Sequence, residues 1–153
     1  MINDYLNSIN LIERLHRQFL EVVKGELDRR GVQDIYNIQA LILYNIGKDE
    51  LTVGELTNRG YYLGSNVSYN VRKMVENEYL VQERSTHDKR SVRVRASDKG
   101  LTLWNSMDEM FRRHADVMGT DAMNGTELQS ANTVLRRLER FWGSPGAYGG
   151  PPL

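Results

Sequence analysis

The feature that most constrains the fold of this chain is an abrupt change of hydrophobic periodicity. From Val67 to Val75 the apolar residues recur every three or four positions, as they do along one face of an amphipathic helix. From Val92 to Ala96 they alternate with arginines, as in a strand that is buried on one side only. The chain is therefore expected to pass from helix to sheet in this region.

Two short helices are predicted around a turn that contains glycine. Thr52 and Glu55 have the spacing of a capping box, in which each side chain binds a free backbone amide at the start of a helix. After the turn-like stretch 60–64, Ser65 is a good N-cap for a second helix that runs to about Asn77. Helices in this arrangement form a candidate helix-turn-helix.

A β-hairpin is predicted directly after the second of these helices. The run from Val81 to Ser85 is the expected partner of the alternating strand. The connection 86–90 is polar, turn-prone and basic, so it suits the tip of a hairpin. A hairpin that follows a helix-turn-helix in this way is a wing.

Longer helices are predicted on both sides of this unit. Apolar periodicity gives helices from Asn3 to Arg29, from Ile35 to Ile46, from the cap Ser97 to about Met118, and from the break at 124–126 to Trp142. The apolar stripes of the first and last helices are larger than one small winged domain needs. They favour a symmetric dimer, and packing within one chain is the alternative.

Composition excludes several classes of protein. The chain has no cysteine, so it can form neither a disulfide nor a thiolate metal site. Its longest aliphatic run, Ala40 to Leu43, is too short to cross a membrane, and its polar N-terminus lacks the pattern of a signal peptide. We therefore expect a cytosolic protein that does not act at a membrane.

Basic charge is concentrated in the predicted reading unit. The whole chain is neutral, with 20 basic and 20 acidic residues. Between Arg59 and Arg95, however, eight basic residues face only four acidic ones. Phosphate binding depends on cations placed against the nucleic-acid backbone, so this local excess favours DNA as a partner. A solvated surface hairpin is the alternative interpretation of the same charges.

The exposed face of the predicted second helix carries side chains suited to DNA. Asparagine can bind adenine through two hydrogen bonds, lysine reaches guanine or phosphate, and serine and tyrosine hydroxyls suit phosphates or base edges. The candidate DNA-binding residues of this helix are Ser65, Asn66, Ser68, Tyr69, Arg72 and Lys73. An ordinary solvent-exposed helix is the alternative, although such a face usually has more glutamate and lysine. Glu76, one turn later, would repel phosphate.

A set of short motifs follows one another across this region: Ser65-Asn66-Val67-Ser68, Tyr79-Leu80-Val81, Asp88-Lys89-Arg90 and Ser97-Asp98-Lys99-Gly100. This pattern, which extends over residues 35–100, resembles the MarR family of regulators. The resemblance implies that Arg90 enters or flanks the minor groove while Asp88 braces the wing. The candidate DNA-binding residues of the wing are Arg84, Asp88, Lys89 and Arg90. Glu78 stands where many members have glycine, so the family template is expected to fit worst at that turn.

These observations lead to one expected architecture. The fold class is mainly α with a small β-hairpin wing, a winged helix-turn-helix with long N- and C-terminal dimerisation helices. The expected parts are dimerisation helices at 1–30 and 101–142, a DNA-binding domain at 31–100 and a flexible tail at 143–153. The expected function is regulation of transcription, with repression as the family's usual mode, by a homodimer on a palindromic operator in double-stranded DNA.

A small-molecule effector is a further expected partner. The resemblance implies a ligand site between the dimer helices and the winged domain, and it makes His16 and Tyr44 candidate pocket residues. His16 lies in the apolar stripe of the first helix, where a polar ring needs a hydrogen bond. A histidine with a purely structural role is the alternative, and the sequence favours it.

Catalytic chemistry is not expected. The chain has three scattered histidines, no glycine-rich phosphate loop and none of the common hydrolase motifs, so the sequence predicts neither an enzyme nor a cofactor. His87 and Asp88 lack a third metal ligand nearby and lie in a basic tip that would repel a cation. The remaining alternative is an adaptor whose winged domain binds protein instead of DNA.

Overall fold

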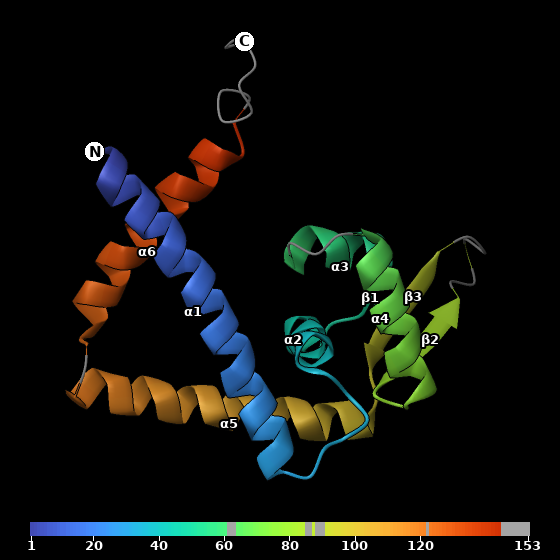
Figure 1. The fold of residues 1–153 in the computed structure, drawn as a ribbon. Helices are drawn as coiled ribbons and strands as arrows, with labels where there is room; N and C mark the ends of the chain where they lie inside the picture. The colour runs from blue at the N-terminus through green and yellow to red at the C-terminus, as the bar shows by residue number, and fades with distance from the viewer. Residues whose placement is uncertain (61–63, 85–86, 88–90, 122, 145–153) are drawn as a thin grey trace. The chain divides into compact units, whose positions relative to one another are not determined.

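The computed structural model describes residues 1–60, 64–84, 87, 91–121 and 123–144. In order along the chain, its elements are α1 (Ile2–Arg29), α2 (Asn37–Ile46), β1 (Leu51–Thr52), α3 (Val53–Gly60), α4 (Gly64–Glu76), β2 (Leu80–Arg84), β3 (Val92–Ala96), α5 (Asp98–Asp121) and α6 (Gly125–Trp142) (Figure 1). They divide into a first unit, residues 1–110, and a second unit, residues 111–153. Mainly helical architecture with a small sheet is confirmed.

The sheet of the first unit has the order β1-β3-β2, and its strands are antiparallel. The hairpin register pairs Leu80 with Ala96 and Arg84 with Val92. Val94 is fully buried, whereas the arginines on either side of it are exposed, so the predicted alternation is confirmed. Strand β1 was not predicted, because two residues are too short a run to show any periodicity.

Helix α2 forms the centre of the first unit. It contacts α1, α3, α4 and β3, and Ile42, Leu43 and Ile46 are fully buried. The side chain of Gln39 is polar, but it too is buried in this interior and leaves only 3% of its surface exposed. Its Oε1 accepts from the Tyr36 backbone N–H at 3.0 Å and its Nε2 donates to Asn70 Oδ1 at 3.2 Å, so the burial cost of the amide is offset.

Several helix ends follow from their capping residues. Thr52 Oγ1 accepts from the backbone N–H of Glu55 at 3.1 Å at the start of α3, as the capping spacing predicts. Ser97 Oγ accepts from the Gly100 N–H at 3.0 Å and so caps α5. Gly47 ends α2 with φ of 57°, a backbone conformation that glycine adopts without strain.

Three predicted boundaries are corrected by the structure. Helix α2 begins at Asn37 and not at Ile35, because Gln39 binds the backbone amide that precedes the helix. Helix α4 begins at Gly64, so Ser65 lies inside its first turn and not at the N-cap. Helix α5 continues to Asp121, beyond the expected end near Met118, because a single glycine such as Gly119 lowers helical propensity without ending a helix.

The second unit consists of the end of α5 and helix α6. Asn124 Oδ1 accepts from the Glu127 N–H at 2.9 Å, and the Glu127 side chain accepts from the Asn124 N–H at 3.0 Å, which completes a capping box. Along α6, Val134, Leu135 and Phe141 are largely exposed. The predicted flexible tail falls, from residue 145 onward, outside the described residues.

Within the described ranges, no helix combines the length and the apolar character that a membrane span requires.

Candidate nucleic-acid interface

Helix α4 has one buried face and one exposed face. Val67, Val71 and Met74 are at most 4% exposed and point into the first unit. Asn66, Ser68, Tyr69 and Arg72 are exposed, and Lys73 retains 43% of its side-chain surface. The structure thus presents these predicted DNA-binding side chains to solvent together, over the length of one helix. Ser65 lies in the first turn, and its side chain is not described.

The exposed face of α4 is polar with one aromatic ring. Tyr69 leaves 54% of its surface in solvent, and Lys73 Nζ lies 5.9 Å from the centroid of its ring. Lys73 Nζ also lies 3.3 Å from Glu76 Oε2. An exposed pair of this kind contributes little to stability, so a phosphate can replace the carboxylate at small cost. Glu76, predicted to repel DNA, is in the structure the ion-pair partner of Lys73.

The hairpin extends the basic surface beyond α4. Helix α4 packs against β2 (Figure 1). Arg84, the last residue of that strand, is exposed. On β3, Arg93 and Arg95 are exposed on the face opposite buried Val94, and Arg95 Nη2 lies 3.3 Å from Glu83 Oε1. The predicted tip residues Asp88, Lys89 and Arg90 lie outside the described residues.

The turn between α4 and β2 has unusual backbone geometry. Glu78 has φ of 68°, in the left-handed region that glycine adopts most readily. The sequence singled out this residue because family members often have glycine there, and the conformation explains that preference. A side chain in this region costs on the order of 1 kcal/mol, so neighbouring contacts must hold the turn in place.

Asp34 joins the loop before α2 to this turn. Its Oδ1 accepts from the Tyr79 hydroxyl at 2.5 Å and its Oδ2 accepts from Lys99 Nζ at 2.7 Å. The hydrogen bonds from Lys99 and then Tyr79 hold the pKa of the Asp34 carboxyl below its usual range. Burial, and then the hydrogen bond to Asp34, raise the pKa of the Tyr79 phenol. At neutral pH the Asp34 carboxyl therefore stays ionised and the Tyr79 hydroxyl stays protonated.

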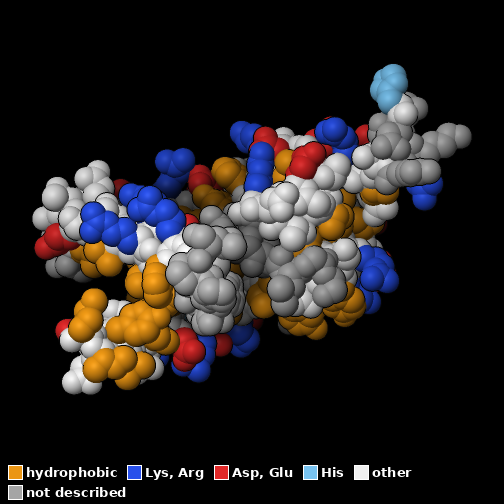
Figure 2. All heavy atoms as spheres, turned by 90° about the horizontal axis from the view of Figure 1, so that it is seen from above, with side chains coloured by type: hydrophobic (Ala, Val, Ile, Leu, Met, Phe, Trp, Pro, Cys, Tyr) orange, Lys and Arg blue, Asp and Glu red, His pale blue; other side chains and the backbone are white. Residues whose placement is uncertain are grey.

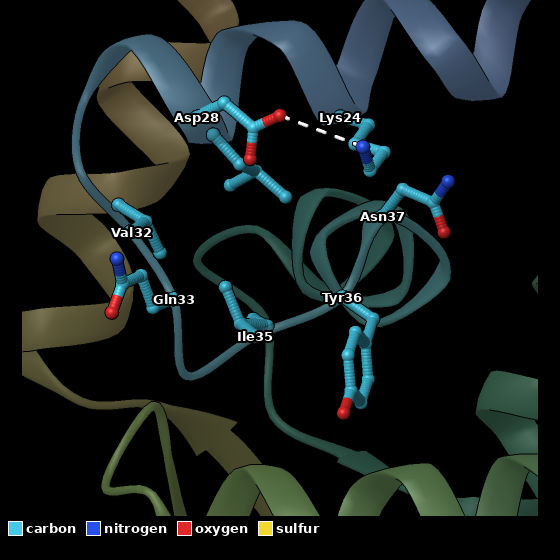
Figure 3. A pocket seen from close by; sticks show the side chains of 8 residues that line it. Lys24, Asp28, Val32, Gln33, Ile35, Tyr36 and Asn37 are labelled. Carbon is cyan, nitrogen blue, oxygen red and sulfur yellow. Dashed lines mark ion pairs between the residues drawn. The ribbon is translucent and has the colours of Figure 1, made fainter.

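Two cavities meet at the loop that carries Tyr36. One has a volume of about 260 Å³, and its walls are formed by this loop, the start of α2, Tyr69 and Lys73 of α4, and Asn77 in the turn after α4. The other, of about 430 Å³, lies between α1 and the same loop (Figure 3). In the wall formed by α1, Lys24 Nζ and Asp28 Oδ2, one helical turn apart, form an ion pair of 3.6 Å. Tyr36, which is 75% exposed, and Gln33 line both cavities.

The predicted effector residues lie on different elements. His16 is exposed on α1. Tyr44 donates its hydroxyl to Asp108 Oδ1 at 2.8 Å and stacks on Trp104, with ring centroids 5.3 Å apart. Neither residue lines the cavities around Tyr36. A shared pocket for the two stays a prediction.

Sequence reasoning missed the residues that hold the turn after α4. Asp34 and Lys99 are 65 positions apart, and Tyr79 lies between them in the chain. No periodicity or local spacing links polar residues at such separations. The available signal was Glu78 itself, a residue with a side chain where family members often have glycine, because such a turn needs stabilising partners elsewhere in the fold.

Comparisons of the sequence point to DNA-binding regulators. A profile described as a winged helix DNA-binding domain matches residues 36–100. The chain is also similar to the exopolysaccharide II synthesis transcriptional activator ExpG of Rhizobium meliloti (strain 1021). The two are 36% identical over 145 residues, which amount to 95% of this chain and 75% of that protein.

Comparisons of the fold agree. A MarR mutant from E. coli, solved in complex with operator DNA, superposes with a TM-score of 0.73 at 16% identity and covers 90% of this chain and 97% of that one. Staphylococcus aureus MarR, solved with salicylate and kanamycin, superposes with a TM-score of 0.71 at 19% identity and covers 90% and 91%. At these identities the similarity establishes the fold.

Proposed function

Because the chain belongs to the MarR family of winged helix-turn-helix transcriptional regulators, we propose that it binds a palindromic operator in double-stranded DNA as a homodimer. Its relatives are regulators of transcription and not enzymes. The observation that carries the proposal is the exposed face of α4, where hydrogen-bonding side chains and cations stand together above a fully buried apolar face. Such a face suits the major groove, which admits a helix.

The proposed contacts divide between base edges and backbone. On α4, Asn66 and Tyr69 are suited to base edges, while Arg72 and Lys73 reach guanine or phosphate. Ser65 and Ser68 complete the proposed set on this helix. On the wing, we assign backbone and minor-groove contacts to Arg84, Asp88, Lys89 and Arg90, by their resemblance to the family pattern.

Apolar side chains that remain exposed support the dimer. Leu11, Leu15 and Val22 on α1 leave 42%, 59% and 43% of their surfaces in solvent. Hydrophobic side chains likewise stand among charged ones on the face drawn in Figure 2. A second copy of the chain would bury these side chains and set two α4 helices about one helical turn of DNA apart, or about 34 Å.

Whether the protein represses or activates transcription is a separate question. The family's usual mode, and the expectation from the sequence, is repression. The relative at 36% identity is described as an activator, which favours activation for this chain. A promoter fused to a reporter and carrying the bound site, measured with and without the protein, separates the two modes. Higher expression with the protein supports activation, and lower expression supports repression.

A small-molecule effector is the second part of the proposal. Staphylococcus aureus MarR was solved with salicylate, a small aromatic acid. In this chain we assign the effector to a pocket with His16 and Tyr44, and the cavity of Figure 3 is large enough to be a second place for it. Thermal unfolding with salicylate should show a higher midpoint, and the increase should be lost in His16→Ala if that residue lines the pocket. An increase retained in His16→Ala and lost in Tyr36→Ala would assign the ligand to the cavity of Figure 3.

Selection of bound fragments from random DNA tests the proposal as a whole. The expected product is a palindrome whose half-sites lie about one helical turn apart. Tyr69→Ala and Asn66→Ala should weaken some selected sites more than others, whereas Arg90→Ala should weaken all of them. Recovery of random fragments, or of none, would favour the protein adaptor. Light scattering should give the mass of a dimer at micromolar concentration, and a monomer would contradict the dimer.

A further inference from the structure

The turn that joins α4, the proposed recognition helix, to the wing is held from one side by the start of α5. Three successive carbonyl oxygens of this turn accept hydrogen bonds from a single short segment. Asn77 O accepts from Lys99 Nζ at 2.9 Å, Glu78 O from Ser97 Oγ at 2.5 Å, and Tyr79 O from the Ser97 backbone N–H at 3.0 Å. The strained residue Glu78 is therefore fixed on both flanks.

Asp34 holds the same turn from the other side. Besides binding the Tyr79 hydroxyl and Lys99 through its carboxylate, it accepts from Asn77 Nδ2 at 2.9 Å through its backbone oxygen. Lys99 Nζ also lies 4.3 Å from the centroid of the Tyr79 ring, within the range of a cation–π interaction. We call the set Asp34, Asn77, Tyr79, Ser97 and Lys99 the turn clamp.

We propose that Asp34 and Lys99 are positioning residues for DNA recognition, which fix the direction of α4 relative to the wing through the turn clamp. The proposal rests on the proposed DNA-binding function. Helix α4 and the hairpin must enter their grooves together, and the turn between them sets their relative direction. If the clamp opens, α4 and the hairpin can each still bind DNA, but they no longer reach their grooves together.

Lys99 acts here as a structural cation. Its ammonium group is surrounded by the Asp34 carboxylate, the Asn77 carbonyl and the Tyr79 ring. A phosphate would have to replace all three of these contacts. The two lysine side chains are about equally exposed, at 45% for Lys99 and 43% for Lys73, but Lys73 has one ion pair at 3.3 Å and a more distant ring at 5.9 Å.

The decisive variant is Asp34→Ala, because two accounts predict opposite results. Electrostatics alone predicts tighter binding, since the change removes a negative charge from the DNA-binding unit. The turn clamp predicts operator binding about tenfold weaker, the size of coupling that one hydrogen-bond network usually carries. Asp49→Ala is the matched control, because Asp49 pairs with Arg59 at 2.7 Å and belongs to the same unit but not to the clamp. It should bind as tightly as the unchanged protein, or more tightly.

The salt dependence of binding tests the role of Lys99. Lys99→Met should lower operator affinity and leave the slope of log K against log salt unchanged, because no phosphate contact is lost. The double variant Asp34→Ala with Lys99→Met should lose no more operator affinity than the single variant that binds more weakly, because both changes open the same clamp. A slope that falls by about one in Lys99→Met would make Lys99 a phosphate contact and overturn its assignment.

Differences in folding between the variants are measured alongside DNA binding. Thermal unfolding gives the folded fraction of each variant at the assay temperature, and Kd is corrected for it. If Asp34→Ala does not fold, Tyr79→Phe replaces it, since that change removes one hydroxyl and should weaken binding about threefold. Binding by the folded clamp variant that equals or exceeds that of the unchanged protein overturns the proposal. Failure of the unchanged protein to bind any selected site refutes instead the proposed function.

Discussion

Gly100 is the position where the close approach of α5 to the turn can be tested most cleanly. A Cβ atom there would overlap the Tyr79 carbonyl oxygen and lie 3.3 Å from Leu43 Cδ1. The carbonyl is already fixed by the Ser97 N–H, so it cannot move away cheaply. Gly100→Ala should therefore cost about 3 kcal/mol from overpacking, reduced to about 2 kcal/mol by the better helical propensity of alanine.

The same helix provides the control. Gly119 has no atom within 4 Å of the position that a Cβ would take, so Gly119→Ala gains helical propensity without a clash. Thermal unfolding should place the midpoint of Gly100→Ala about 4–8 °C below that of the unchanged protein. Gly119→Ala should match or exceed it. If Gly100→Ala unfolds at the same temperature as Gly119→Ala, α5 does not approach the turn this closely and the reasoning is refuted.

Three further predictions concern charge, dimerisation and the recognition helix. Because the Asp34 pKa is lower in the folded protein, its stabilising contribution is present above about pH 4 and is lost as the pH falls through the folded value. The difference in unfolding midpoint between the unchanged protein and Asp34→Ala should thus shrink from pH 7 to pH 3; a constant difference would contradict the ion pair. Leu15→Arg should shift the mass in light scattering toward the monomer, since a charge cannot be buried unpaired in an apolar interface; an unchanged dimer would remove this face of α1 from the interface. Arg72→Ala should weaken binding to operator and to random DNA, and an unchanged affinity for both would exclude Arg72 from the interface.

Much of the fold could be predicted from periodicity alone. The apolar positions from Val67 to Met74, the alternation around Val94 and the cap at Ser97 correctly indicated helix, strand and helix. These signals are local, because each depends on spacings within one element. The presentation of Tyr69 and Arg72 to solvent followed from the same helical geometry.

The turn clamp could not be predicted in the same way. Asp34 lies in the loop between α1 and α2, where no periodicity singles it out, and its partners Tyr79 and Lys99 are 45 and 65 positions away. Their meeting depends on how α2, the turn and α5 pack, which only the assembled fold provides. Glu78 indicated an unusual turn, but it did not indicate which side chains would stabilise that turn.

The most direct test of the central claim is a salt titration of operator affinity. The account predicts that the protein binds the selected palindrome far more tightly than a scrambled duplex, and that log K falls linearly with log salt. It also predicts that Lys73→Ala reduces the slope by about one for each subunit that contacts a phosphate through this residue. Equal affinity for the two duplexes, or a slope near zero, would contradict sequence-specific DNA binding by this chain.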